Sequence, residues 1–313
     1  MKRIYILYFF QFLFINIMFS QQITQYSNFV ANSFFYNPAV VGGHDCLVVK
    51  SGHRNQWTGF EGSPKSTFLS LSTSLHNSKK FHPGTFVGLG GYFQTETFGA
   101  FKKSTLNFAY AYTTPINEKT TVAFGTYLGL QQLGIDASLI NMHDGFDPLI
   151  ISSREVFLIP DLGAGAFIER KKSYLGYSGK QITANSWSKL VESNLSKNQW
   201  HHLIMGGKRF EKNKLNIVPN FLFKYVKGSL PSVDLNLNLE FSDVFNVGCS
   251  WRNNDAIVLT THFKVLDHLH FYYAYDITTS NINSASNNTH ELIIGYKHCP
   301  KSFKKEPVSP IFY

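Results

Sequence analysis

Polar and apolar residues alternate one by one along much of this chain, most clearly over residues 233–241. The odd positions of that segment are Val, Leu or Phe, whereas the even positions are Asp234, Asn236, Asn238 and Glu240. Because successive side chains of a β-strand point to opposite faces, the segment predicts a strand with one apolar and one polar face. Such a strand separates an apolar environment from a wet one along its whole length.

The same alternation recurs along the chain. The second face is repeatedly Gly, Ala, Ser or Asn, which is typical of a crowded or wet lumen and not of a dry sandwich core. With weaker candidates included, the pattern predicts fourteen strands, at 46–57, 65–75, 84–94, 103–114, 120–133, 161–168, 173–178, 200–210, 215–227, 232–241, 245–251, 256–263, 269–277 and 289–298.

The connections between these strands are sorted by length. If the first strand runs outward, five of the six connections on the periplasmic side are about five residues or fewer. The two longest connections, 134–160 and 179–199, both fall on the outside. We therefore predict an all-β fold, an antiparallel transmembrane β-barrel of about fourteen strands over residues 46–298.

Composition agrees with a membrane-embedded surface. The chain has 313 residues, of which 16% are aromatic and only 16% are charged, against about 25% charged in soluble domains. Many basic residues fall in the proposed periplasmic turns, including Lys119, Arg170, Lys171 and Lys172. They either keep charge away from lipid or form a basic rim for an acidic periplasmic partner.

Residues 1–20 are typical of a signal peptide. Lys2 and Arg3 precede an apolar run of about twelve residues, and Ser20 suits a signal peptidase. We expect residues 21–45 to form an N-terminal periplasmic segment or a plug in the barrel, the alternative being a free tail, and residues 299–313 to form a C-terminal tail. The formal charge of +9 includes two signal-peptide cations, so the mature chain carries 9 − 2 = +7.

No catalytic or metal-binding pattern is present. The histidines lack the compact spacing of a zinc site, and no nucleophile motif exists, so we expect no enzyme activity, no metal and no cofactor. Gly88, Gly90 and Gly91, like Gly163 and Gly165, lie inside predicted strands, where strand curvature or close packing in the lumen explains them better than a phosphate loop does. The scattered basic residues also make nucleic acid an improbable partner.

The three cysteines, Cys46, Cys249 and Cys299, are an odd number and too few for a disulfide framework. We therefore expect packing residues and no disulfide that holds the fold together.

Two stretches resemble the PorP/SprF family. The N-terminal one runs from Gln25-Tyr26-Ser27 through Asn37-Pro38-Ala39 to a motif that contains Arg54, Gln56, Trp57 and Gly59. The C-terminal one includes Tyr273-Ala274-Tyr275-Asp276 and His290-Glu291. The resemblance covers nearly the whole mature chain, although residues 134–200 match poorly.

This resemblance implies an outer-membrane component of the type IX secretion system of Bacteroidota, associated with gliding motility. It also implies two partners: a large secreted surface protein or adhesin, recognised through its C-terminal sorting domain, and a periplasmic secretion ring or peptidoglycan-binding adaptor. The competing interpretation is a porin or a transporter of hydrophobic molecules, because fourteen strands enclose enough space for a channel. Candidate lumen residues for binding are Asp234, Asn236, Asn238, Glu240 and Asp276.

Overall fold

The computed structural model describes residues 23–43, 46–75, 85–136, 154–183, 199–212, 215–241 and 244–299, and these form one antiparallel sheet. The predicted signal peptide, most of the C-terminal tail and the two long connections (137–153 and 184–198) lie outside the described residues. The strands are β1 (Leu47–Asn55), β2 (Lys65–Leu75), β3 (Phe86–Phe98), β4 (Phe101–Asn117), β5 (Thr120–Asp136), β6 (Arg154–Arg170), β7 (Ser173–Lys180), β8 (His201–Lys208), β9 (Phe210–Lys212), β10 (Leu215–Val226), β11 (Ser232–Glu240), β12 (Phe245–Arg252), β13 (Ala256–Leu266), β14 (Leu269–Thr278) and β15 (Thr289–His298).

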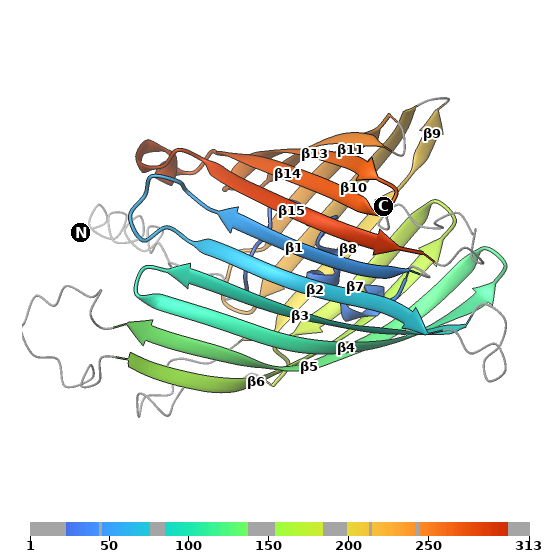
Figure 1. The fold of residues 1–313 in the computed structure, drawn as a ribbon, viewed down its shortest axis with the longest axis horizontal. Coiled ribbons are helices and arrows are strands. Elements are labelled where there is room, and N and C mark those ends of the chain that lie inside the picture. Colours follow the sequence, from blue (N-terminus) through green and yellow to red (C-terminus); the bar gives the residue numbers. More distant parts are fainter. Residues whose placement is uncertain are drawn as a thin grey trace, which may run out of the picture.

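The sheet closes on itself. β1 pairs with β15, and β10 pairs with both β8 and β11, so every long strand has two neighbours (Figure 1). β8 and β9 are separated only by Arg209 and both pair with β10, so together they form one interrupted barrel strand. The predicted fourteen-strand antiparallel barrel is therefore confirmed. β6 is much longer than the predicted 161–168, because residues 156–159 are consecutively apolar and are followed by Pro160, so this stretch shows no alternation.

The two faces of each strand lie where the alternation predicted. Asp234 is 1% exposed and points into the barrel, whereas its neighbour Leu235 is 48% exposed on the outside. Leu69, Phe108 and Leu128 extend this apolar outer surface over β2, β4 and β5. Such an outer surface is suited to lipid. In the described part of the chain, no helix has the length and apolar character needed to cross a membrane.

The barrel has two distinct ends. At one end β1 begins and β15 finishes, with Leu47 opposite His298. Cys46 and Cys299 are disulfide-bonded there, so we call it the disulfide end. The opposite end, the loop end, carries residues 56–64, 227–231 and 279–288, the last containing the short 3-10 helix η4 (Asn281–Ala285).

The expectation of no structural disulfide is wrong. Counting cysteines ignores barrel closure, which brings residues 253 positions apart onto neighbouring strands. Because Leu47 and His298 form the last rung of the β1–β15 pair, the next residues outward face each other. The odd cysteine, Cys249, has a free thiol and is exposed on the outer face.

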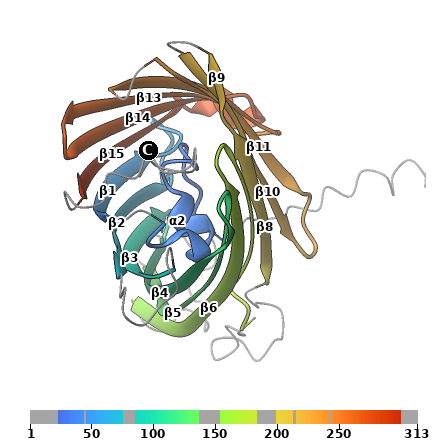
Figure 2. The same cartoon turned by 90° about the vertical axis from the view of Figure 1, so that its right-hand side faces the viewer.

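Residues 23–43 lie inside the barrel, and we call them the plug. They contain the one-turn helix α2 (Ser33–Tyr36) and the 3-10 helix η1 (Pro38–Val40), and the strands surround α2 (Figure 2). Ile23 lies near Trp57 and Ser280 at the loop end, whereas Gly42 lies against Gly88 near the disulfide end. The plug therefore crosses the lumen from one end to the other.

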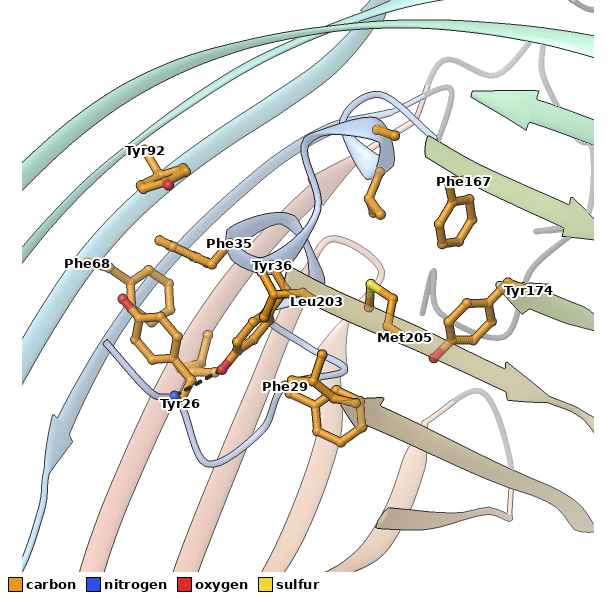
Figure 3. Packing of buried hydrophobic residues seen from close by; sticks show 14 of the residues in the cluster. Tyr26, Phe29, Phe35, Tyr36, Phe68, Tyr92, Phe167, Tyr174, Leu203 and Met205 are labelled. Carbon is orange, nitrogen blue, oxygen red and sulfur yellow. Dashed lines mark hydrogen bonds between the residues drawn. The ribbon is translucent and has the colours of Figure 1, made fainter. Parts of the chain in front are cut away.

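The plug supplies much of the buried apolar core. Tyr26, Phe29, Phe35 and Tyr36 meet wall residues of many strands in one cluster (Figure 3), which are Phe68, Tyr92, Ala123, Phe167, Tyr174, Leu203, Met205, Leu222, Tyr272 and Ile293. The Phe35 ring centre lies 4.8 Å from that of Phe68 and 4.5 Å from that of Tyr92. Each buried aromatic side chain contributes about 1.5–3 kcal/mol to stability. The lumen is therefore packed like a protein core.

Candidate functional site: the attachments of a lumen plug

Arg54, near the loop end of β1, binds the start of the plug. Its guanidinium donates to the carbonyl of Gln25 at 3.0 Å and to the hydroxyl of Ser27 at 3.1 Å. It also donates to Asp276 Oδ2 at 3.1 Å and to Gln56 Oε1 at 2.8 Å. These five residues come from motifs that are far apart in the sequence, and one planar side chain with five donors joins them.

Glu291, on the neighbouring strand β15, accepts hydrogen bonds from the same part of the plug. Its carboxylate accepts hydrogen bonds from the backbone N–H of Ser27 at 2.6 Å and of Asn28 at 3.2 Å, and from Asn32 Nδ2 at 3.2 Å. The Arg54 Nε atom lies 3.9 Å away. Glu291 and Arg54 are directly paired in the sheet, which brings the two charges together.

Arg252, at the loop end of β12, contacts the plug from a third direction. It donates to the carbonyl of Tyr26 at 3.0 Å, to Asp234 Oδ1 at 3.0 Å and to Asp255 Oδ2 at 3.1 Å. Lys224 Nζ donates to the other oxygen of Asp234 at 3.0 Å. Arg252 is therefore anchored by carboxylates while one edge of its guanidinium remains directed at the plug.

We call the five side chains Arg54, Asp234, Arg252, Asp276 and Glu291 the latch. All five are at most 3% exposed, and the two arginines and three acids are connected by ion pairs. Buried charges of this kind are tolerated only when each is paired and hydrogen-bonded. The latch binds main-chain carbonyls and amides, so it recognises an extended backbone as well as the hydroxyl of Ser27.

Tyr26 adds an apolar contact beside the latch. Its ring centre lies 5.0 Å from that of Phe68 and 4.9 Å from that of Phe35. Its hydroxyl donates to Gln94 Oε1 at 2.9 Å, and its backbone N–H donates to the Tyr36 hydroxyl at 3.1 Å. Burial raises the pKa of the Tyr26 hydroxyl, so the group stays protonated and remains a donor.

Asn37 organises the other end of the plug. Its side-chain Nδ2 donates to the carbonyls of Ala166 and Tyr177 at 3.1 and 3.3 Å, across β6 and β7. Its Oδ1 accepts the Ala39 N–H at 2.9 Å and so caps η1, in which Pro38 fills the first position. The Asn-Pro pair thus joins a turn in the plug to the barrel wall.

Glycines in the wall leave room for this turn. A Cβ on Gly125 of β5 would lie 2.5 Å from the Ala39 nitrogen and 2.6 Å from the Pro38 carbonyl carbon. A Cβ on Gly165 would overlap Asn37 Oδ1, and one on Gly88 would overlap the Val41 carbonyl. We call Gly88, Gly125, Gly165 and Gly176 the socket. Gly88 and Gly125 pack against backbone of the plug, and Gly165 and Gly176 pack against the Asn37 side chain. Close lumen packing, predicted for Gly88 and Gly165, is confirmed; Gly91 lies on the outer face beside Phe108.

Two side chains of β7 bind the plug between the latch and the socket. Lys180 Nζ donates to the Phe35 carbonyl at 2.7 Å, and Ser178 Oγ donates to the Tyr36 carbonyl at 2.5 Å. The Lys180 ammonium also lies 5.7 Å from the ring centre of Tyr92 and 5.5 Å from that of Tyr127. These contacts orient the middle of the plug.

Trp57 and Gly59 belong to the loop between β1 and β2. In the part of the chain that the structure describes, neither residue hydrogen-bonds to the plug. The Trp57 N–H donates to Thr289 Oγ1 at 3.0 Å, and the Thr58 N–H donates to the Asn288 carbonyl at 2.8 Å. Gly59 takes a positive φ of 86°. These residues join the β1–β2 loop to the start of β15 at the loop end.

The predicted lumen residues separate into two groups. Asp234 and Asp276 both belong to the latch. Asn236 instead donates to Ser250 Oγ at 2.8 Å, and Glu240 forms an ion pair with Arg209 at 3.3 Å, farther toward the disulfide end. Asn238 lines a small cavity beside Glu240. The polar face of β11 is therefore a lumen face, but it is not one site.

Sequence reasoning missed Arg252 and Lys180 and did not assign a binding role to Glu291. A signal existed for Arg252: it lies on the lumen face of its strand and is paired in register with Asp234. The sequence pattern identifies such a face but not the partner across the lumen. No group of three or more potential metal ligands occurs in the described residues. His262 and His270 hydrogen-bond to each other at 3.0 Å.

Comparison with solved structures finds outer-membrane barrels. The toluene transporter TbuX of Ralstonia pickettii is 8% identical, with a TM-score of 0.53 over 85% of this chain and 93% of that one. A deletion mutant of the monoaromatic hydrocarbon channel TodX is 6% identical, with a TM-score of 0.50 over 84% of this chain and 93% of that one. At such identities the likeness concerns the fold alone. No curated protein matches this chain.

The family comparison covers most of the sequence. The model of the type IX secretion system membrane protein PorP/SprF matches residues 18–296, a range that includes the plug, the latch and all the strands except the end of β15. The latch and the socket therefore lie inside the part of the chain that the family shares. The chain belongs to the PorP/SprF family of type IX secretion system membrane proteins and lies, as a β-barrel of that family, in the outer membrane.

Proposed function

We propose that this protein is a plugged, non-enzymatic barrel of the type IX secretion system that helps to export or anchor one cognate cell-surface protein. In this role the barrel is a docking platform in the outer membrane, and its own lumen is not the route for small solutes. The cargo is recognised through its C-terminal sorting domain at the loop end. Gliding motility depends on the barrel where the cargo is an adhesin that moves cells.

The observation that carries this proposal is the filled lumen. The plug is clamped by the latch, and three cavities between plug and wall have volumes of only about 50, 10 and 50 Å³. A cavity of about 620 Å³ lies at the loop end, where Ile23, Trp57 and Leu230 are among its lining residues. Family-motif residues thus hold the lumen shut and line a surface hollow at one end.

Orientation follows from the strand ends. An even number of strands puts both chain termini of a bacterial barrel in the periplasm. Because β1 begins and β15 finishes at the disulfide end, we propose that this end faces the periplasm and that the loop end faces the cell surface. The two long connections leave from the loop end, since β5 finishes there at Asp136 opposite Arg154 of β6, and β7 finishes there at Lys180 opposite His201 of β8. A dedicated cargo requires a dedicated surface, which fits loops that match the family poorly.

The periplasmic partner is proposed to contact the disulfide end. Arg170 is the last residue of β6 at that end, Lys171 and Lys172 form the turn to β7, and Lys119 lies in the neighbouring turn. Clustered positive charge favours an acidic surface on the partner, such as a peptidoglycan-binding adaptor or the secretion ring.

Passage of small hydrophobic molecules is the second candidate. Its support is the likeness in fold to the toluene transporter TbuX and to the hydrocarbon channel TodX. The charged latch and the packed aromatic core argue against it, because a hydrocarbon path needs a continuous apolar opening.

The two candidates are separated by removing the gene from its host and measuring both surface proteins and channel activity. The proposal expects that one large protein disappears from the cell surface and returns with the wild-type gene, and that the purified barrel shows no steady conductance in a planar bilayer. An unchanged set of surface proteins, together with slower growth on aromatic hydrocarbons, would favour the transporter.

A further inference from the structure

A cavity between the plug and the wall near the disulfide end is lined by three basic side chains. Its volume is about 50 Å³, and Lys50, His270 and Lys297 contribute to its lining together with the plug around Ser33. No carboxylate belongs to the lining residues that the structure describes. The cavity has room for about four water molecules, which is close to the size of one small oxyanion.

The register of four adjacent strands positions these groups. Ser70 of β2 is paired with Lys50 of β1, Lys50 is paired with Gly295 of β15, and Gly295 is paired with His270 of β14. The glycine leaves space between the two basic side chains. A Cβ there would approach His270 and Tyr272 only to 3.6 Å and Lys50 to 3.7 Å.

The positive charge of this cavity is not neutralised by a nearby acid. Lys50 Nζ donates to the Ala31 carbonyl at 2.5 Å and lies 5.7 Å from the Tyr272 ring centre, so it is held at the cavity without a counter-ion. The Lys297 ammonium forms no ion pair with any described residue.

A neighbouring cavity shows that this charge is local. It also has a volume of about 50 Å³ and shares Ala31 and Tyr272 with the first cavity. Its described lining contains Glu240, Asn238 and Asn246, but neither lysine nor arginine. The two cavities have equal volumes and share Tyr272, but lysines line only the first.

We infer that the basic cavity binds a phosphate group between the plug and the barrel wall. Lysine ammonium groups bind phosphate as point charges, and hydroxyls such as those of Ser33 and Ser70 supply additional donors. A ligand that contacts both Ser33 of the plug and Lys50 of the wall stabilises the plugged state. This site goes beyond the proposed function and does not depend on it.

Calorimetric titration of the full-length barrel in detergent, at constant ionic strength, tests the site with inorganic phosphate. We expect saturable binding that Lys297→Gln weakens at least about tenfold, since it removes one of two lysine charges. Lys172→Gln is the control: its side chain is exposed at the same end and pairs with Glu211 at 2.7 Å. Binding that is absent in the wild type, or equal in both variants, would overturn the inference.

Thermal unfolding of the wild type provides a test that needs no variant. Phosphate should raise the melting temperature above that in chloride of the same ionic strength, because a ligand that binds only the folded state stabilises it. Equal melting temperatures would contradict the inference. Glycerol phosphate identifies the source: tighter binding than inorganic phosphate assigns the site to a phospholipid headgroup, and equal or weaker binding assigns it to the free ion.

Discussion

Residues 25–28 of the plug are held by charged side chains of the wall, whereas residues 37–42 are held by wall backbone that glycines leave uncovered. At the latch, Arg54, Arg252 and Glu291 reach across a gap to carbonyl and amide groups. At the socket, Gly125 and Gly88 let two backbones touch. Both attachments join the plug to the wall, but the latch uses long charged side chains of the wall, whereas the socket uses wall backbone and the Asn37 side chain of the plug.

This difference determines how each attachment fails. Shortening a charged latch side chain weakens the latch, because a buried charge then loses its partner. The socket fails when an atom is added, because Ala39 and Val41 present backbone that cannot move aside.

Removal of residues 24–42 breaks both attachments at once and should have the largest effect. Fourteen strands enclose a lumen wide enough for solutes once the core of Tyr26, Phe35 and Tyr36 is gone. We expect the deletion variant to show steady conductance in a planar bilayer, where the wild type shows none. A closed deletion variant that is inserted in the membrane would mean that other residues seal the barrel.

Arg54→Met breaks the latch alone. The substitution keeps an unbranched side chain but leaves the buried Glu291 without its cation, and it leaves Asp276 with only Arg252 at 3.8 Å. Breaking a buried ion pair in this way costs about 3–5 kcal/mol. The expected result is a correspondingly lower free energy of unfolding in urea and detergent, together with earlier proteolysis near residues 25–28. Lys172→Met is the matched control, since its exposed ion pair contributes about 1 kcal/mol or less.

Gly125→Ala breaks the socket alone. One methyl group would lie 2.5 Å from the Ala39 nitrogen, and overpacking of this kind costs about 1–3 kcal/mol. The control is Gly91→Ala on the outer face, where the nearest atom is 3.2 Å away and the plug is not involved. Equal unfolding free energies for the two variants would show that the socket does not restrain the plug.

The sequence predicts the wall better than it predicts the attachments. Alternation of period two follows directly from strand geometry, so residues 233–241 reveal both the strand and the lumen face of Asp234. The family resemblance singles out Gln25-Tyr26-Ser27, Arg54, Asp276 and Glu291 without saying that they meet. Their meeting depends on barrel closure, which pairs Arg54 with Glu291 and Glu291 with Ala274 on adjacent strands.

The socket and the disulfide were hidden for the same reason. A glycine inside a strand indicates close approach by something, but Gly125 and Gly165 lie far in sequence from Asn37 and Ala39. Likewise Cys46 and Cys299 become neighbours only when β1 and β15 pair. Periodicity is a local signal, whereas the partner of a lumen residue is set by how the sheet closes and by what fills it.

Tyr26→Phe should have the smallest effect and separates the two forces that act beside the latch. The substitution keeps the ring against Phe35 and Phe68 and removes only the hydroxyl that donates to Gln94 at 2.9 Å. Loss of one such hydrogen bond costs about 0.5–1.5 kcal/mol. Tyr26→Ala, measured beside it by unfolding in urea, should cost about 3–5 kcal/mol because the ring leaves a cavity. If the two variants lose equal stability, the hydroxyl and not the ring holds this part of the plug, and the latch then works through polar contacts alone.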